Sequence, residues 1–182
     1  GLDFDLRERM NIEVADLLRS QGTTCLMVTH DQNDAFAFGR QIGVMRSGEL
    51  EQWATPHQVY HEPRSKFVAD FIGSGVFLSG RVINHKTIHT DYVDLESIVC
   101  SRWSIGTKLE VLIRPDDIIY DPSSDLKVDV RSKAFKGSQT LYTLGVEGKS
   151  SLLALFPSHE NFTIGDSVNI RFKVDHVVAY PL

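Results

Sequence analysis

The 182-residue chain has little of what marks secreted, membrane-spanning or nucleic-acid-binding proteins. Its two cysteines, Cys25 and Cys100, lie far apart and form no CxxC motif, which excludes a disulfide scaffold and favours a reducing compartment. It lacks an apolar run of the roughly 18 residues that a membrane-spanning helix needs. No basic stretch leads into an apolar one, so no signal peptide is expected. The formal net charge of −5 argues against nucleic-acid binding.

What the chain does have, in its first part, is a mixture of helix and strand patterns. Apolar residues spaced three and four apart predict an amphipathic helix over 5–20 that ends near Gly22. The apolar run 23–29 does not alternate with polar residues, which favours a strand buried on both faces, as in a parallel sheet. Asp31 is a good N-cap for a short helix that ends at Gly39.

A hairpin and short helices follow. Strands are predicted over 42–46 and 49–53, joined by a tight turn. Thr55 is expected to cap the next helix, because Pro56 suits the first helical position. The predicted order of elements in this part is therefore helix, strand, helix, hairpin and helices.

The clearest boundary is Gly-Ser-Gly at 73–75, which predicts one domain over 1–73 and a second over 76–182. After it, short runs rich in valine, isoleucine and tyrosine are separated by glycine, aspartate, proline and serine. This pattern predicts an all-β barrel or sandwich. We expect the aromatic residues of this part to form its core, and these are Phe135, Tyr142, Phe156, Phe162, Phe172 and Tyr180.

His30 is the candidate for chemistry, because it stands where the predicted strand 23–29 gives way to a helix. A histidine at the carboxyl end of a strand projects into the crevice where open α/β sheets bind ligands. The alternative is a histidine that hydrogen bonds of the fold satisfy, and by itself the residue does not decide between the two.

Longer stretches decide it, because they resemble a known family. "LMVTHDQNDAF" and "IGVMRSGELEQWATPHQVYHEPRSKFVADFIG" are similar to the last third of an ABC-transporter ATPase of the binding-protein-dependent importer type. "VLIRPDDI" and "GDSVNIRFKVDHVVAYP" resemble the C-terminal β domain of these importers, a TOBE-type region with oligonucleotide-binding-like barrels. The implied fold is the end of a P-loop NTPase-type domain, an α/β fragment, followed by an all-β TOBE barrel.

The resemblance implies roles for four residues. His30 matches the switch (H-loop) histidine, which contacts the γ-phosphate of ATP, and phosphoryl transfer does need positioned donors near developing charge. Asp3 matches the D-loop aspartate that communicates across the ATPase dimer, although Asp3 also suits a helix N-terminus. Asp31 and Gln32 match the family's "HDQ" as supporting residues, and capping alone also accounts for them. Asp34 departs from the usual glutamate.

Three motifs of such an ATPase are missing from the sequence. It contains no phosphate loop of the form GxxxxGK(S/T), no LSGGQ-like signature, and no apolar strand ending in Asp-Glu. We therefore interpret the chain as a C-terminal fragment. The parent protein is expected to use ATP and Mg²⁺ and to hydrolyse ATP, and the fragment alone is expected to be inactive and to hold no cofactor.

The implied partners are a second copy of the ATPase subunit, the transmembrane permease subunits and, indirectly, a periplasmic or lipoprotein solute-binding protein. The expected location is the cytoplasm, peripheral at the inner face of the membrane. "FIGSGVFLSG" looks most like the ferric-iron importer branch, so iron is the expected solute, while the sugar, polyamine and sulfate branches share the architecture and stay open as alternatives. Alternatively, the chain is a stand-alone regulatory, small-ligand-binding or dimerisation module with no ATPase role.

No metal site is expected. His57 and His61 have the spacing of two zinc ligands on a helix but lack a third ligand at a recognisable spacing. His85 and His89 lie on a strand or turn, where residues four apart are too distant to chelate one ion tightly.

Overall fold

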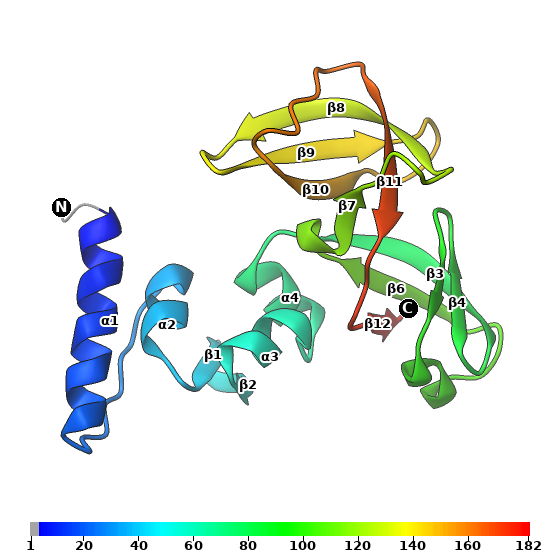
Figure 1. Cartoon of the computed structure of the whole chain (residues 1–182). Coiled ribbons are helices and arrows are strands. Elements are labelled where there is room, and N and C mark those ends of the chain that lie inside the picture. The colour runs from blue at the N-terminus through cyan, green and yellow to red at the C-terminus, as the bar shows by residue number, and fades with distance from the viewer. Residues whose placement is uncertain (1–3) are drawn as a thin grey trace. The chain divides into compact units, whose positions relative to one another are not determined.

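A computed structural model describes residues 4–182, which fold as two compact units: unit 1, which ends at Ile72, and unit 2, Gly73–Leu182 (Figure 1). Unit 1 holds helices and one hairpin. The regular secondary structure of unit 2 consists of β-strands and two 3₁₀ turns. The elements of unit 1 are α1 (Phe4–Ser20), α2 (Gln32–Phe38), β1 (Ile42–Arg46), β2 (Glu49–Ala54), α3 (Pro56–His61) and α4 (Lys66–Ile72).

The first helix, α1, confirms the periodicity argument and ends as expected. Gly22 adopts a positive φ of 64° and donates its N–H to the carbonyl of Arg19, while the N–H of Thr23 bonds the carbonyl of Leu18. This pair of bonds is a Schellman motif, which satisfies the last helix carbonyls. Among the α1 side chains that the structure describes, most apolar ones are exposed, with Leu17 at 57%, and Ala15 is the one that is buried.

The strand expected over 23–29 is wrong. These residues form an extended, irregular segment, and Leu26 and Val28 are 80% and 92% exposed. A strand requires a neighbouring strand to bond its N–H and carbonyl groups. Within residues 4–182 no strand pairs with this segment, so an apolar run that suits a buried strand has nothing to bury it.

The hairpin β1–β2 and helices α3 and α4 share a small core. Its buried residues are Ile42, Val44, Val59, Val68 and Ile72. The predicted hairpin and helix starts are confirmed, and Thr55 caps α3 through a capping box, in which its hydroxyl accepts the N–H of Gln58 and the Gln58 side chain returns to the Thr55 N–H.

Gln52 is a buried polar residue of this core. Its amide donates to the carbonyl of Glu62 at 3.2 Å and accepts the N–H of Arg64 at 2.8 Å. Because a buried amide without partners is costly, these bonds fix the chain between α3 and α4 against β2.

Unit 2 contains two five-stranded antiparallel sheets, ordered β10-β9-β8-β11-β7 and β12-β6-β3-β4-β5. Figure 1 shows the first mostly in yellow and orange and the second mostly in green. The prediction of an all-β second part is therefore confirmed. Its strands are β3 (Val76–Asn84), β4 (Thr87–Thr90), β5 (Asp94–Glu96), β6 (Lys108–Ile113), β7 (Ile118–Tyr120), β8 (Lys127–Phe135), β9 (Gln139–Gly145), β10 (Leu152–Pro157), β11 (Ser167–Phe172) and β12 (Val178–Pro181), with 3₁₀ turns η1 (Ile98–Arg102) and η2 (Pro115–Asp117).

One hydrophobic core joins both sheets of unit 2. Tyr142 and Phe156 are its largest fully buried side chains, with ring centroids 5.4 Å apart. Phe162 packs against both rings, and Phe172 is partly buried against the same core. Phe135, expected in the core, is instead 74% exposed, because it ends β8 beyond the last residue that pairs with β11. Among the described residues, no helix is long and apolar enough to cross a bilayer.

Candidate functional site

His30 lies in a bend between the extended segment 23–29 and the start of α2, and its side chain is exposed. The neighbours of His30 are held in place. Thr29 Oγ1 accepts the N–H of Asp31 at 3.0 Å, and the Asp31 carboxylate accepts the N–H of Asn33 at 2.9 Å. The backbone at His30 is thus anchored on its C-terminal side while the imidazole remains open to solvent.

Asp31 is the N-cap of α2, as the sequence predicts. Its backbone is extended, at φ −92° and ψ 118°, and its carboxylate bonds the free N–H at the helix start. Gln32 follows directly, and its side-chain amide donates to the carbonyl of Phe71. Both residues therefore have structural partners that position the start of α2.

Helix α2 is also tied to α1. Asn11 Nδ2 donates to Asp34 Oδ1 at 2.8 Å. Asp34, the departure from the family pattern, thus has a partner on α1. The other candidate of this part, Asp3, lies outside the described residues.

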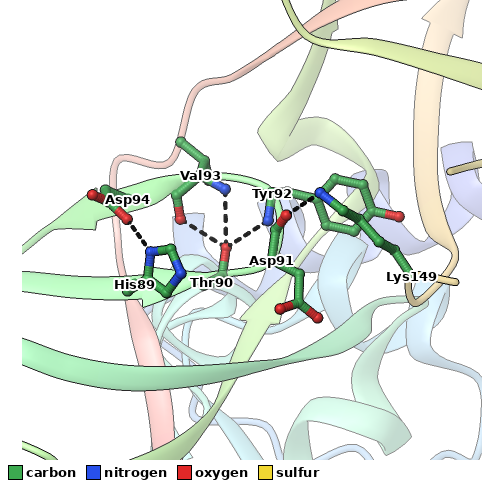
Figure 2. Close-up of polar contacts among 7 residues, drawn as sticks. All are labelled: His89, Thr90, Asp91, Tyr92, Val93, Asp94 and Lys149. Carbon is green, nitrogen blue, oxygen red and sulfur yellow. Dashed lines mark hydrogen bonds and ion pairs between the residues drawn. The ribbon is translucent and has the colours of Figure 1, made fainter.

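The two histidine pairs differ in the structure. His57 and His61 lie side by side on α3, with ring centroids 4.3 Å apart and ring planes tilted by 39°. His89 Nδ1 lies 2.6 Å from the carboxylate of Asp94 on the neighbouring strand β5, as Figure 2 shows. Among the described residues, no group of three or more histidine, cysteine, aspartate or glutamate side chains could hold a metal ion.

Next to this pair, the β4–β5 turn of the second sheet and the β9–β10 turn of the first sheet are joined by hydrogen bonds. Figure 2 shows Lys149 from the β9–β10 turn reaching the carbonyl of Asp91, with its ammonium 4.9 Å from the centre of the Tyr92 ring. Tyr92 in turn donates its hydroxyl to the carbonyl of Ser150. Burial raises the pKa of the Tyr92 phenol.

Sequence reasoning missed Arg114, a buried arginine that follows strand β6. Only 3% of it is exposed, and its guanidinium donates to the carbonyls of Gly73 and Ser74 at 2.8 and 3.2 Å. The backbone N–H of Arg114 donates to Asp117 Oδ2 at 2.7 Å. Burial raises the pKa of the Asp117 carboxyl to about 6. The available signal was an arginine that directly follows the apolar run in "VLIRPDD".

A cavity of about 260 Å³ opens beside strands β7 and β10 of unit 2. Tyr120 and Phe156 supply aromatic surface to it, and Glu160 supplies the charged group among its lining residues. These two strands are the outer strands of the first sheet.

Residues 111–179 match the TOBE domain family. This chain carries a TOBE domain. The match runs from β6 to β12, so it includes the two segments in which the chain passes from one sheet of unit 2 to the other, 114–117 and 173–177. It confirms the TOBE-type β domain that the sequence predicts.

Similarity extends beyond this domain. The chain is 31% identical over 190 aligned positions to the spermidine/putrescine import ATP-binding protein PotA of Mannheimia succiniciproducens, covering 98% of this chain and 50% of that protein. It is 33% identical to PotA of Bacteroides thetaiotaomicron over 95% of this chain and 37% of that protein. With PotA of Vibrio cholerae it shares 42% identity over 65% of this chain and 33% of that protein.

These relatives confirm the resemblance to ATP-binding subunits of ABC importers, and the chain spans half or less of their length. They do not support ferric iron as the solute, because their names state spermidine and putrescine. The cytoplasmic molybdate-binding protein ModG is also similar in structure, with a TM-score of 0.43 and 14% identity over 57% of this chain and 93% of that one. A likeness of this size supports no statement about what unit 2 binds.

Proposed function

We propose that this chain is part of the ATP-hydrolysing subunit of an ABC importer for polyamines. The observation that carries the proposal is similarity to import ATP-binding proteins over 95% and 98% of the chain, so both units are matched. If the chain were a stand-alone β module, we would expect relatives of this kind to match unit 2 alone. Spermidine and putrescine are the proposed solutes, because the relatives are named for them.

Within this function, His30 acts as the switch residue. Its exposed imidazole would contact the γ-phosphate and hold the attacking water or the catalytic carboxylate in place, since phosphoryl transfer depends on positioned donors. The N-cap bond of Asp31 supports this role, because it fixes the chain next to His30. Gln32 supports it through the bond that holds α2 to Phe71.

ATP and Mg²⁺ are the proposed substrate and cofactor of the longer protein. The described residues alone do not fit them, since the sequence has no glycine-rich loop whose N–H groups could cradle phosphates. The 182 residues by themselves are therefore proposed to be inactive. Asp3 would act near the nucleotide of a second subunit. Permease subunits, an external solute-binding protein and a location at the inner face of the cytoplasmic membrane complete the proposal.

The test is uptake by cells in which the gene is deleted and then restored. We expect deletion to abolish import of labelled spermidine or putrescine through this system and to leave ferric-iron import unchanged. Loss of iron import with normal polyamine import would contradict the proposed solute. Normal import of both would contradict an importer role for this protein.

A variant pair tests the role of His30 in the native protein. His30→Ala is expected to lower ATP hydrolysis by about a hundredfold while ATP binding persists, because it removes a transition-state contact. His57→Ala is the matched control, since His57 is another exposed histidine of unit 1 that the proposal does not use. Equal hydrolysis by the two variants would contradict the role given to His30.

A further inference from the structure

The buried guanidinium of Arg114 lies at a junction of unit 2. The chain enters the unit through residues 73–75, directly before β3 of the second sheet. Arg114 binds the carbonyls of Gly73 and Ser74 in this entry segment. Hydrogen bonds from a charged donor are stronger than those between neutral groups, and they are stronger still away from water. The entry segment is thereby fixed from a site about 40 residues further along the chain.

Both crossings between the two sheets pass through the same junction. Residues 114–117 lead from β6 of the second sheet to β7 of the first. Residues 173–177 lead back from β11 to β12, and the N–H of Lys173 donates to the carbonyl of Asp117 at 2.7 Å. Asp117 also accepts the N–H of Arg114, which closes the turn. One short turn therefore touches the entry segment and both crossings.

The fit at the entry segment leaves little free space. A Cβ atom added at Gly75 would lie 2.9 Å from Leu112 Cδ1 and 3.3 Å from Arg114 Nη1. Glycine at this position lets the backbone approach the guanidinium closely. The close approach and the buried donor act together, because either a larger residue at 75 or a shorter one at 114 would separate them.

We propose that Arg114 is a positioning residue that locks the entry segment 73–75 onto the turn where the two sheets exchange strands. The segment then moves with both sheets of unit 2 instead of acting as a free linker. A movement of one sheet against the other would therefore also move residues 73–75, through which the chain enters unit 2. The inference goes beyond the proposed transport function and does not depend on it.

A nitroxide label at position 74 tests the lock in the whole chain. Ser74 is exposed, and Ser74→Cys keeps the backbone carbonyl that Arg114 binds. The exposed Cys25 is replaced by serine, and the buried Cys100 remains. We expect an immobilised label in this background. Arg114→Met is expected to raise the mobile population about tenfold, because a charge-assisted hydrogen bond is lost.

Two further variants separate the lock from general loss of folding. Arg131→Met is the matched control, since Arg131 also donates to a carbonyl, that of Val146, but not to the entry segment. Its spectrum at position 74 should match the unmodified background. Arg114→Lys keeps the charge without the planar fork and should give intermediate mobility, with circular dichroism confirming the fold.

A mobile label in the unmodified background would overturn the proposal. So would an unchanged spectrum in Arg114→Met with the fold retained. If Arg114→Met does not fold, Arg114→Lys and Gly75→Ala decide. Increased mobility in both supports the lock, and an unchanged spectrum in both overturns it.

Discussion

Unit 2 buries its apolar residues within itself, whereas unit 1 leaves many of its own exposed. Among the described residues, the core cluster of unit 2 holds eighteen buried residues and that of unit 1 holds five. Leu17, Leu26 and Val28 of unit 1 are more than half exposed, although their pattern is that of buried elements. The difference teaches that local sequence decides helices and hairpins, while a buried strand exists only beside its neighbours.

The largest expected effect comes from the core of unit 2. Leu152 is fully buried between the sheets, so Leu152→Ala removes packed methyl groups and leaves a cavity. We expect a loss of about 2 to 5 kcal/mol in the free energy of unfolding. Urea denaturation followed by Trp103 fluorescence in a Trp53→Phe background measures it. A loss under about 1 kcal/mol would mean that this core is loosely packed.

The next effect concerns pH, through Asp117. Its pKa in the folded state, about 6, lies above its ordinary value of 3.8, so the native state holds this proton more tightly than the unfolded chain. The resulting stability is full below 3.8 and is lost as the pH rises through 6. Between about pH 4 and about pH 7.5, the free energy of unfolding of the wild type should fall by roughly 1 to 2 kcal/mol relative to that of Asp117→Asn, after allowance for the partial exposure of Asp117.

Denaturation of both proteins at the two pH values checks this prediction. Other carboxyl groups, such as Asp121 and Asp166 with lowered pKa values, act in the opposite direction, but they cancel in the comparison. A difference between the two proteins that does not change with pH would show that Asp117 titrates in its ordinary range.

A smaller effect is expected at the cap of α3 in unit 1. Thr55→Ala removes the hydroxyl that accepts the N–H of Gln58 and should cost about 1 kcal/mol. Hydrogen exchange of the first amides of α3 would measure the local loss, with His57→Ala as a variant that keeps the cap. Equal protection in both variants would mean that packing of Val59, which is buried, holds the helix without its cap.

The smallest effect is expected on the exposed stripe of α1. Leu17→Ala makes the same chemical change as Leu152→Ala, but at a side chain that is 57% exposed. We expect the free energy of unfolding to change by no more than about 0.5 kcal/mol in this chain. Denaturation followed by Trp53 fluorescence in a Trp103→Phe background checks it. A loss as large as that of Leu152→Ala would erase the contrast between the units.

The sequence was sufficient wherever interactions are local. The cap at Asp31, the cap at Thr55 and the stop at Gly22 each depend on neighbours within a few residues, and each is confirmed. The alternation of short apolar runs likewise predicted the β structure of unit 2. The strand over 23–29 failed, because its pattern says nothing about which other strands are present.

The candidate site was predicted only in part. The position of His30 before a capped helix follows from local pattern, while its proposed role came from family resemblance. For Arg114 the sequence offered only its place directly after an apolar run. Its contacts could not be predicted, because its partners lie about 40 residues away and are backbone carbonyls, which carry no residue signature. Phe135 was misplaced for a related reason, since pairing of β8 with β11 ends before it.

The most direct test of the central claim is the intact mass and N-terminal sequence of the native polypeptide that contains these residues. The account predicts a species much heavier than 20.5 kDa, with a phosphate loop upstream of Gly1 that supplies the ATP site for His30. A native polypeptide of 20.5 kDa would contradict it, since His30 would then have no nucleotide to contact.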